Sequence, residues 1–310
     1  MEAVAAPLIA IVGPTASGKS ALAMCLAGEL QAEIVSCDSL QVYRGLDIGS
    51  AKATPEERAR VPHHLVDVVS PQEAFSAAEY ARLGREALAG IASRGRLAIV
   101  AGGSGLYLRA LLVGLFAGPS RDARLRERLE RLAGRFGSAR LHRVLSRVDP
   151  AAAERTSPRD QVRIVRALEV FWVTGRPISS LRGEGARPLE GFRSLVLGLA
   201  PDRERLRAAV TARTRRMLES GLLSETAAVL EAAGGVVPRP LEAIGYRQAV
   251  AVLRGELALP EAEQAIVTAT MRFAKRQMTW FRHQAHAVWF SSPEEARGAA
   301  LKWLDGGPVS

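Results

Sequence analysis

The chain has 310 residues, of which 48% are hydrophobic and 24% charged, so it can bury a core of one or two domains and is not wholly disordered. Its formal net charge of +10 favours a polyanionic partner such as nucleic acid. An Arg-rich surface without such a partner gives the same surplus. Two cysteines are too few for a disulfide framework or a zinc quartet.

Targeting and membrane segments are not indicated by the sequence. Its first residues are acidic rather than basic, unlike those of a secretory signal. Every apolar run is shorter than the roughly 18 residues that a membrane span needs. We therefore expect a cytoplasmic protein with no membrane partner.

Short apolar runs alternate with helical patterns in the first hundred residues. Strands that alternate with helices indicate a parallel sheet with helices on both faces, so we predict an α/β fold. The predicted strands cover residues 8–12, 33–36, 97–101, 194–199 and 288–290, and a helix is predicted over residues 76–93.

A helical, arginine-dense stretch interrupts this pattern. We predict an all-helical insertion domain over residues 119–189, within an α/β core that comprises residues 1–118 and 190–310 and ends in several helices. Within the insertion, Arg159, Arg163 and Arg166 recur at i, i+4 and i+7, which would place them in one stripe on a helix.

A phosphate-binding motif follows the first predicted strand. Gly13-Pro14-Thr15-Ala16-Ser17-Gly18-Lys19-Ser20 matches G-x-x-x-x-G-K-[ST] at every fixed position, with a strand before it and a helix after it. In that context backbone amides and a helix N-terminus converge on phosphate oxygens. Lys19 would add a full charge, and Ser20 would bind Mg²⁺. The motif does not say whether the phosphates belong to a nucleotide or to another diphosphate.

Asp38 lies at the carboxyl end of the second predicted strand, where a parallel sheet binds its ligands. Its carboxylate would therefore face the phosphate site, and the alternative is a helix N-cap. His63 and His64 open the segment HHLVDVV, and we interpret them as structural residues rather than metal ligands or bases.

Seven segments between residues 13 and 282 resemble those of the bacterial tRNA dimethylallyltransferases, or isopentenyltransferases. The segments are GPTASGKS, DSLQVYRGLDIGSAK, PHHLVDVVSPQEAFS, AGGSGLYLRAL, QVRIVRALEV, AIGYRQ and RQMTWFR. They occur in order and cover nearly the whole chain. The DSLQVYRGLDIGSAK block is far more specific than the phosphate-binding motif.

The resemblance implies a P-loop NTPase-like core and a helical insertion that contacts tRNA. It also implies transfer of the dimethylallyl group of dimethylallyl diphosphate to N6 of adenosine 37, next to the anticodon. The products would be N6-(dimethylallyl)adenosine and diphosphate. The implied cofactor is Mg²⁺, the RNA partner is the anticodon stem-loop of tRNA, and we expect a monomer.

Site residues follow from the same resemblance, position by position. Asp38 would be the general base, and Lys19, Ser104 and Arg213 would complete the catalytic set. Ser104 and Ser20 stand where relatives often have threonine, so the hydroxyl is kept. The implied tRNA contacts are Asp38, Ser39, Leu40, Gln41, Ser104, Arg126, Gln161, Val162, Arg163, Ile164, Val165, Ala243, Ile244, Gly245, Tyr246, Arg247 and Gln248.

These residue types fit the implied chemistry. Adenine N6 is a weak nucleophile, and a carboxylate that removes its proton contributes typically about 10²–10⁴-fold. Departure of diphosphate builds negative charge, which loop amides, Lys19, Arg213 and Mg²⁺ would stabilise. The target base must leave its stack to reach Asp38.

A second basic surface is predicted near the C-terminus. One helix face should be apolar and its flank basic, which fits either phosphate contacts or a solvated surface. The apolar residues are Val267, Met271, Ala274, Met278 and Phe281, and the basic flank contains Arg272, Lys275, Arg276, Arg282 and His283.

Three other functions stay open on the residues alone. A nucleotide kinase would use the motif on ATP, but the strand at 97–101 ends in Gly102-Gly103-Ser104-Gly105, where an acid is expected. An adenylate isopentenyltransferase shares the core but acts on free nucleotides, which does not account for the helical insertion. A non-catalytic RNA-binding ATPase leaves DSLQVYRG unexplained.

Overall fold

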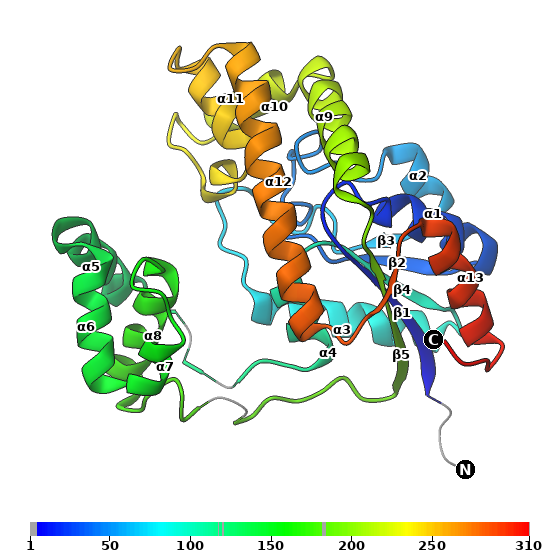
Figure 1. Cartoon of the computed structure of the whole chain (residues 1–310), viewed down its shortest axis with the longest axis horizontal. Helices are drawn as coiled ribbons and strands as arrows, with labels where there is room; N and C mark the ends of the chain where they lie inside the picture. The colour runs from blue at the N-terminus through cyan, green and yellow to red at the C-terminus, as the bar shows by residue number, and fades with distance from the viewer. Residues whose placement is uncertain (1–4, 117, 120, 182–183, 310) are drawn as a thin grey trace. The chain divides into compact units, whose positions relative to one another are not determined.

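A computed structural model describes residues 5–116, 118–119, 121–181 and 184–309 (Figure 1). The chain forms two compact units, Met1–Leu112 with Leu189–Ser310, and Val113–Pro188. We call the first the core unit and the second the helical unit. The sequence pattern suggested an insertion over residues 119–189, whereas the helical unit begins at Val113 and ends at Pro188.

The core unit contains one parallel sheet, which in the described residues has six strands in the order β3-β2-β4-β1-β5-β6. The predicted α/β class is confirmed. Because β1 pairs with both β4 and β5, the motif that follows β1 emerges near the middle of the sheet's carboxyl edge. The strands are β1 (Ala6–Val12), β2 (Glu33–Ser36), β3 (His63–His64), β4 (Ala98–Ala101), β5 (Phe192–Leu199) and β6 (Val288–Phe290).

The segment HHLVDVV, which begins at His63, contributes only the two-residue strand β3 to the sheet. Leu65 and Asp67 have φ values of 62° and 56°, so the chain leaves the extended conformation immediately after His64. Val69 then forms an isolated parallel bridge with Tyr43. The segment therefore belongs to the loops above the sheet rather than to a full edge strand.

Helices of the core unit begin at side-chain caps where the chain offers them. Ser76 Oγ accepts a hydrogen bond from Glu79 N at 3.1 Å, and Asp202 Oδ1 accepts from Arg205 N at 2.9 Å. Each such cap contributes about 1 kcal/mol. The helices are α1 (Lys19–Leu30), α2 (Pro55–Arg60), α3 (Ala77–Ser93), α4 (Gly105–Leu112), α9 (Arg203–Glu219), α10 (Leu222–Ala232), α11 (Tyr246–Leu253), α12 (Leu259–Gln284) and α13 (Pro293–Leu304), with a 3₁₀ helix η1 (Arg239–Glu242).

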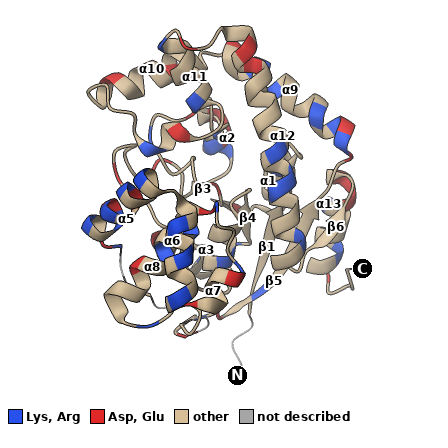
Figure 2. Cartoon of the chain, turned by 60° about the vertical axis from the view of Figure 1, so that its left-hand side comes forward, with Lys and Arg blue, Asp and Glu red and all other residues tan. Residues whose placement is uncertain are grey.

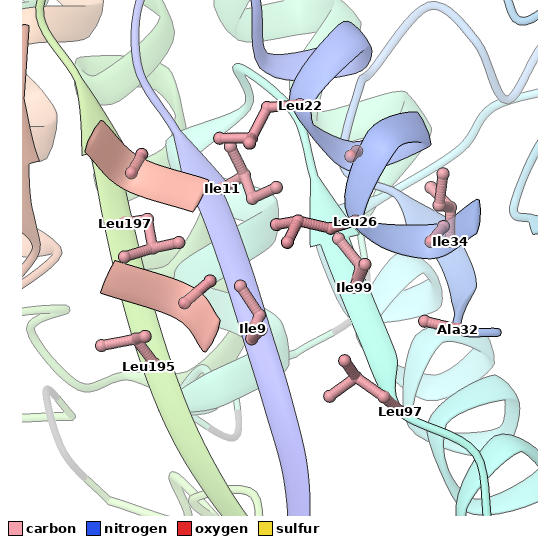
Figure 3. Close-up of a cluster of buried hydrophobic side chains, with 14 of the residues drawn as sticks. Ile9, Ile11, Leu22, Leu26, Ala32, Ile34, Leu97, Ile99, Leu195 and Leu197 are labelled. Carbon is pink, nitrogen blue, oxygen red and sulfur yellow. The ribbon is translucent and has the colours of Figure 1, made fainter. Parts of the chain in front are cut away.

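Alternate residues of each strand point to opposite faces of the sheet. Helices cover both faces, so both are buried. Ile9 and Ile11 pack with α1 and α13 on one face, as Figure 3 shows for part of that cluster. Leu8 and Ala10 pack with α3, α4 and the end of α12 on the other. Burial of each isoleucine or leucine contributes roughly 1.5–3 kcal/mol, so the sheet is a firm support for the loops at its edge.

A third buried cluster of the core unit joins the segment after Asp38 to α10 and α11. Its buried members include Tyr43, Leu46, Leu222, Leu241 and Tyr246. Among the described residues, no helix is long and apolar enough to cross a membrane.

The helical unit contains α5 (Ala123–Phe136), α6 (Ser138–Val148), α7 (Pro150–Glu154) and α8 (Gln161–Thr174). Leu129, Leu141, Leu145 and Leu168 fill its own apolar core. α5 and α6 carry several exposed arginines, whose positions are blue on the ribbon in Figure 2. The unit thus has a packed interior and a basic exterior.

Candidate active site

The phosphate-binding motif forms a tight turn between β1 and α1. Gly13 has φ 141°, and a Cβ there would lie 2.5 Å from the carbonyl oxygen of Leu199, so only glycine fits. Gly18 has φ 92° and caps α1, whose first residue is Lys19. The N-terminus of α1 therefore faces the turn, an arrangement that attracts an anion.

Two cations lie at this turn, of which Lys19 is buried and Arg213 is half-buried. Lys19 Nζ donates to the carbonyl oxygen of Pro14 at 2.5 Å, and Arg213 Nη1, from α9, donates to Thr15 Oγ1 at 3.0 Å. Burial, and then the Arg213 guanidinium, lowers the pKa of Lys19 to about 7. Burial also lowers the pKa of Arg213. The turn therefore holds positive charge at an energetic cost that a bound anion would reverse.

The polar groups of the turn are also incompletely satisfied. Neither Lys19 nor Arg213 forms an ion pair with a carboxylate in the part of the chain that the structure describes. The Ser17 hydroxyl is buried without a hydrogen-bond partner. Buried polar groups normally form hydrogen bonds or ion pairs. A bound phosphate would supply such partners to the Ser17 hydroxyl and to the two cations.

Asp38 follows β2 and is fixed by its own loop. Its Oδ1 accepts from Leu40 N at 2.8 Å, and Ser39 N donates to Ser104 Oγ at 3.0 Å. Ser104 N in turn donates to the carbonyl oxygen of Cys37 at 3.1 Å. Ser104 therefore joins the loop after β4 to the loop that carries Asp38. The structural role of its hydroxyl is to accept the hydrogen bond from Ser39 N.

Gln41 belongs to the same loop. Its Oε1 accepts from Ser36 Oγ at 2.7 Å, and its Nε2 donates to the carbonyl oxygens of Ser50 and Ala51 at 3.3 and 3.2 Å. The Gln41 side chain thus connects the end of β2 to the segment near residue 50.

Gln277 is a site residue that sequence reasoning missed. Its Oε1 accepts from Thr15 N at 2.9 Å, and its Nε2 donates to the carbonyl oxygen of Gly103 at 2.9 Å. One amide on α12 therefore holds the phosphate-binding turn and the Ser104 loop together. A signal was present, because Gln277 lies three residues after Ala274 and four before Phe281, within the apolar face of the helix.

These groups line one cavity of about 810 Å³ in the core unit. It brings together the turn after β1, the Asp38 loop, the Ser104 loop, α9 and α12, all at the carboxyl edge of the sheet. The predicted residues that line it are Thr15, Ala16, Ser17, Gly18, Lys19, Ser20, Asp38, Ser39, Leu40, Gln41, Ser104, Arg213, Ala243, Ile244 and Gly245.

Several predicted RNA contacts have buried side chains instead. Ile164 and Val165 are 0% exposed in the core of the helical unit, so their side chains are not accessible there, and their RNA contact stays a prediction. Tyr246 donates to Glu225 Oε1 at 2.6 Å, and Gln248 Oε1 accepts from Gly245 N at 2.9 Å, so both are occupied in the interior of the core unit.

Arg159, Arg163 and Arg166 do not form the predicted stripe on one helix. α8 begins at Gln161, so Arg159 precedes the helix. Arg166 donates to Glu169 and to the carbonyl oxygen of Pro119, and the Arg126 side chain, 12% exposed, pairs with Glu130 and Glu169.

The remaining predicted RNA contacts have accessible side chains. On α8, Gln161 is half-buried, Val162 is 60% exposed and Arg163 is exposed. Arg247, on α11 of the core unit, is exposed as well. These residues are accessible and others of the predicted set line the cavity, and that any of them contacts RNA stays a prediction.

The predicted face of α12 is present. Val267, Ala274 and Phe281 are buried and Met271 and Met278 half-buried, whereas Arg272, Lys275, Arg276, Arg282 and His283 are exposed. Lysine and arginine positions along this helix are blue on the ribbon in Figure 2.

The two histidines have structural partners, as interpreted from the sequence. His64 Nε2 lies 2.7 Å from Glu33 Oε2, and Glu33 also accepts from Arg94 Nη2 at 2.7 Å. His63 Nδ1 lies 2.8 Å from the carbonyl oxygen of Val61. Glu33 is the first residue of β2, at the opposite end of the strand from Asp38.

The comparisons with known proteins point in the same direction. The family model described as IPP transferase matches residues 41–284. A tRNA dimethylallyltransferase of Solibacter usitatus is 49% identical over 299 residues, which are 95% of this chain and 97% of that protein. One of Koribacter versatilis is 50% identical over 282 residues, 91% of this chain and 92% of that protein.

Solved structures are similar over 97% or more of this chain, and the eukaryotic one named below is itself covered to 81%. The full-length tRNA isopentenylpyrophosphate transferase from Bacillus halodurans is 36% identical, with a TM-score of 0.69 over 97% of this chain and 96% of that chain. A eukaryotic dimethylallyltransferase acting on tRNA shares the fold, with a TM-score of 0.79 at 24% identity. With a phosphate-binding turn and an acid in one cavity, and with these matches over most of its length, the chain belongs to the IPP transferase family.

Proposed function

We propose that this protein transfers the dimethylallyl group of dimethylallyl diphosphate to N6 of adenosine 37 in tRNA. The observation that carries the proposal is the placement of two unlike groups in one cavity. The Lys19 and Arg213 cations line one part of it, at the turn after β1, and the Asp38 carboxylate lines another. A leaving diphosphate needs the first and a nucleophilic amine needs the second.

The diphosphate would be held by the turn after β1. The backbone amides of the turn, Lys19 and Arg213 would bind its oxygens, and the Ser17 hydroxyl would gain a partner there. As the C–O bond of the allylic substrate breaks, negative charge grows on the diphosphate, and these preformed donors stabilise it.

Mg²⁺ is the metal that this site suits. Ser20 is exposed at the first turn of α1, and no group of three or more His, Cys, Asp or Glu side chains in the described residues could hold a metal alone. Mg²⁺ is commonly held by one protein oxygen together with substrate phosphates and water, so Ser20 is the residue that would bind it. When bound, it would neutralise part of the charge on the leaving diphosphate.

Asp38 would accept the proton of adenine N6 as the new C–N bond forms. Its hydrogen bond from Leu40 N fixes the carboxylate before the substrate arrives. Preorganisation of this kind lowers the cost of reaching the reactive geometry. Ser104 supports the role indirectly, because its hydroxyl holds the backbone of Ser39.

tRNA is the substrate proposed because its relatives are named for it and because the surface is basic. The related proteins from Solibacter usitatus and Koribacter versatilis are tRNA dimethylallyltransferases. Exposed cations on α12 and on the helical unit suit a phosphate backbone, which positions the anticodon stem-loop while the target base enters the cavity.

A labelled-substrate assay tests the proposal. The protein is mixed with labelled dimethylallyl diphosphate, Mg²⁺ and either an anticodon stem-loop that contains A37 or free AMP. Label on the stem-loop alone supports the proposal. Label on AMP would instead make the protein an adenylate isopentenyltransferase, and ATP consumption without label transfer would make it a kinase or an ATPase.

The role of Asp38 is tested in the same assay. Asp38→Asn keeps the shape of the side chain but removes the base, so turnover should fall about 10²–10⁴-fold while stem-loop affinity stays near that of the parent. Asp305→Asn, an exposed residue outside the cavity lining, is the control. A normal rate for Asp38→Asn would remove Asp38 from the base role.

A further inference from the structure

The segment after Asp38 is anchored by a carboxylate that neither the sequence motifs nor the proposed chemistry accounts for. Glu225, on α10, accepts three consecutive backbone N–H groups. Its Oε2 accepts from Asp47 N at 2.8 Å and Ile48 N at 2.7 Å, and its Oε1 accepts from Gly49 N at 3.1 Å. Successive N–H groups that converge in this way form an anion-binding nest, and here the protein's own carboxylate fills it.

Tyr246 completes this anchor from a second helix. Its hydroxyl donates to Glu225 Oε1 at 2.6 Å, and its side chain is fully buried. The ring lies so close to the segment that a Cβ at Gly49 would be 2.4 Å from it. Glycine at position 49 therefore lets the backbone approach Tyr246. Together, Glu225 and Tyr246 hold residues 47–49 against α10 and α11.

The anchored segment forms part of the cavity wall. Gly49, Ser50 and Ala51 line the cavity, and the carbonyl oxygens of Ser50 and Ala51 accept from Gln41 Nε2. Gln41 is three residues from Asp38 and lines the cavity with it. Hydrogen bonds therefore run from Glu225 through residues 47–51 to the side chain of Gln41.

The phosphate side of the cavity is held by other residues. The turn after β1 is positioned by Gln277 from α12 and by Arg213 from α9. Among the described residues, the hydrogen bonds of Glu225 and the Tyr246 hydroxyl join residues 47–49, α10 and α11 and do not include that turn. The two sides of the cavity thus have separate supports.

We propose that Glu225 is a positioning residue that holds residues 47–51 and Gln41 as the wall of the cavity against which the target nucleoside is placed. This inference rests on the proposed function. This role requires the negative charge of Glu225. Its carboxylate accepts from four donors, the backbone N–H groups of residues 47–49 and the Tyr246 hydroxyl. A glutamine amide of the same size would turn its NH₂ group toward some of these donors.

The experiment compares Glu225→Gln and Tyr246→Phe with Glu231→Gln, an exposed glutamate on the same helix. Glu225→Gln should raise the KM for the anticodon stem-loop about tenfold, because charge-assisted bonds that hold the wall are lost. Tyr246→Phe removes one bond and should raise it about two- to fivefold. The Kd of inorganic diphosphate, which probes the phosphate side, should stay unchanged in all three variants.

Several results would overturn the proposal. A lower Tm of Glu225→Gln with an unchanged KM for the stem-loop would make the residue merely structural. An equal rise in the Kd of diphosphate would show general distortion of the cavity. If Glu225→Gln does not fold, a parental KM for Tyr246→Phe contradicts the proposal. Failure of the parent protein itself to label the stem-loop, with diphosphate still bound, would instead overturn the proposed function.

Discussion

Buried charge is handled in opposite ways in the two units of this protein. In the core unit, the buried Lys19 and the half-buried Arg213 lie at the turn after β1 without a carboxylate partner among the described residues. In the helical unit, Glu169 is 0% exposed, and its carboxylate accepts from Arg166 Nη1 at 2.9 Å and from the backbone N–H of Asp122 at 2.9 Å. Arg126 Nη1 lies 3.6 Å from the same carboxylate.

The difference separates a binding site from a structural device. Charges that are neutralised within the chain stabilise packing, because their removal leaves a buried partner unpaired. Charges left without a partner destabilise the free protein and are retained where a ligand supplies the opposite charge. The sign of the stability change on mutation should therefore differ between the two sites.

Lys19→Met should have the largest effect on function. Loss of one preformed cation at the leaving group should lower kcat about 10²–10³-fold. The same change should raise the Tm of the free protein, because a buried charge beside Arg213 is removed. Steady-state kinetics and thermal unfolding measure the two effects, and Lys302→Met, at an exposed lysine, is the control. A lower Tm would show that the Lys19 side chain stabilises the free protein.

Glu169→Gln should have the largest effect on stability. It leaves two guanidiniums without their buried partner, at a cost of about 3 kcal/mol, near the lower end for buried pairs because both arginines keep some solvent contact. Urea unfolding measures the change. Glu130→Gln, at an exposed partner of Arg126, should cost under about 0.5 kcal/mol. Diphosphate affinity should not change in either variant, and equal losses would show that burial is not decisive.

Lys19 should couple diphosphate binding to proton uptake. Because burial lowers its folded pKa to about 7, below the unfolded value of 10.5, the unfolded chain binds more protons between these pH values. The Lys19 contribution therefore makes the free protein more stable as pH rises from about 7 to 10.5. A bound anion raises the pKa again, so binding at pH 8 should take up as much as one proton.

Calorimetry in buffers of different ionisation enthalpy measures this uptake. The Lys19 contribution should weaken diphosphate binding by at most about tenfold per pH unit above pH 7. The same titration of Lys19→Met gives the part that belongs to diphosphate itself. Equal proton uptake by the two proteins would show that Lys19 is already charged in the free protein.

Arg163→Ala should have the smallest effect. Arg163 is exposed and, within the described part of the chain, pairs only with Asp160, at 3.0 Å, so stability should change by less than about 0.5 kcal/mol. If Arg163 contacts an RNA phosphate, stem-loop affinity should fall and the slope of log K against log salt should decrease by about 1. Arg60→Ala, at an exposed arginine that ends α2, is the control. An unchanged slope would make Arg163 a surface residue.

The sequence predicted features whose cause is local. The motif at residues 13–20 requires only a strand, glycines at set positions and a following helix, and all are present. The predicted strands at 33–36 and 288–290 agree with β2 and β6, because apolar runs of that length bury well in a parallel sheet. The apolar face of α12 follows from its spacing alone.

Side-chain roles were predicted less well where a residue's partner lies elsewhere in the chain. Spacing predicted Arg166 in one helix stripe with Arg159 and Arg163, and the resemblance implied an RNA contact for Arg126, but both guanidiniums lie against the buried carboxylate of Glu169. Ile164 and Val165 belong to a motif and yet fill a core, because α8 turns that face inward. A motif names the residues of a segment but not which of its faces is buried.

By itself, then, the sequence determined the fold class, the phosphate-binding turn and the family, because each is encoded by residues close together in the chain. Tertiary structure alone decided how the cavity is held. Gln277 meets Thr15 across 262 positions, Arg213 meets it across 198, and Glu225 meets Asp47 across 178. Many polar side chains could bond a given backbone group, and only the packing of α9, α10 and α12 selects which ones do.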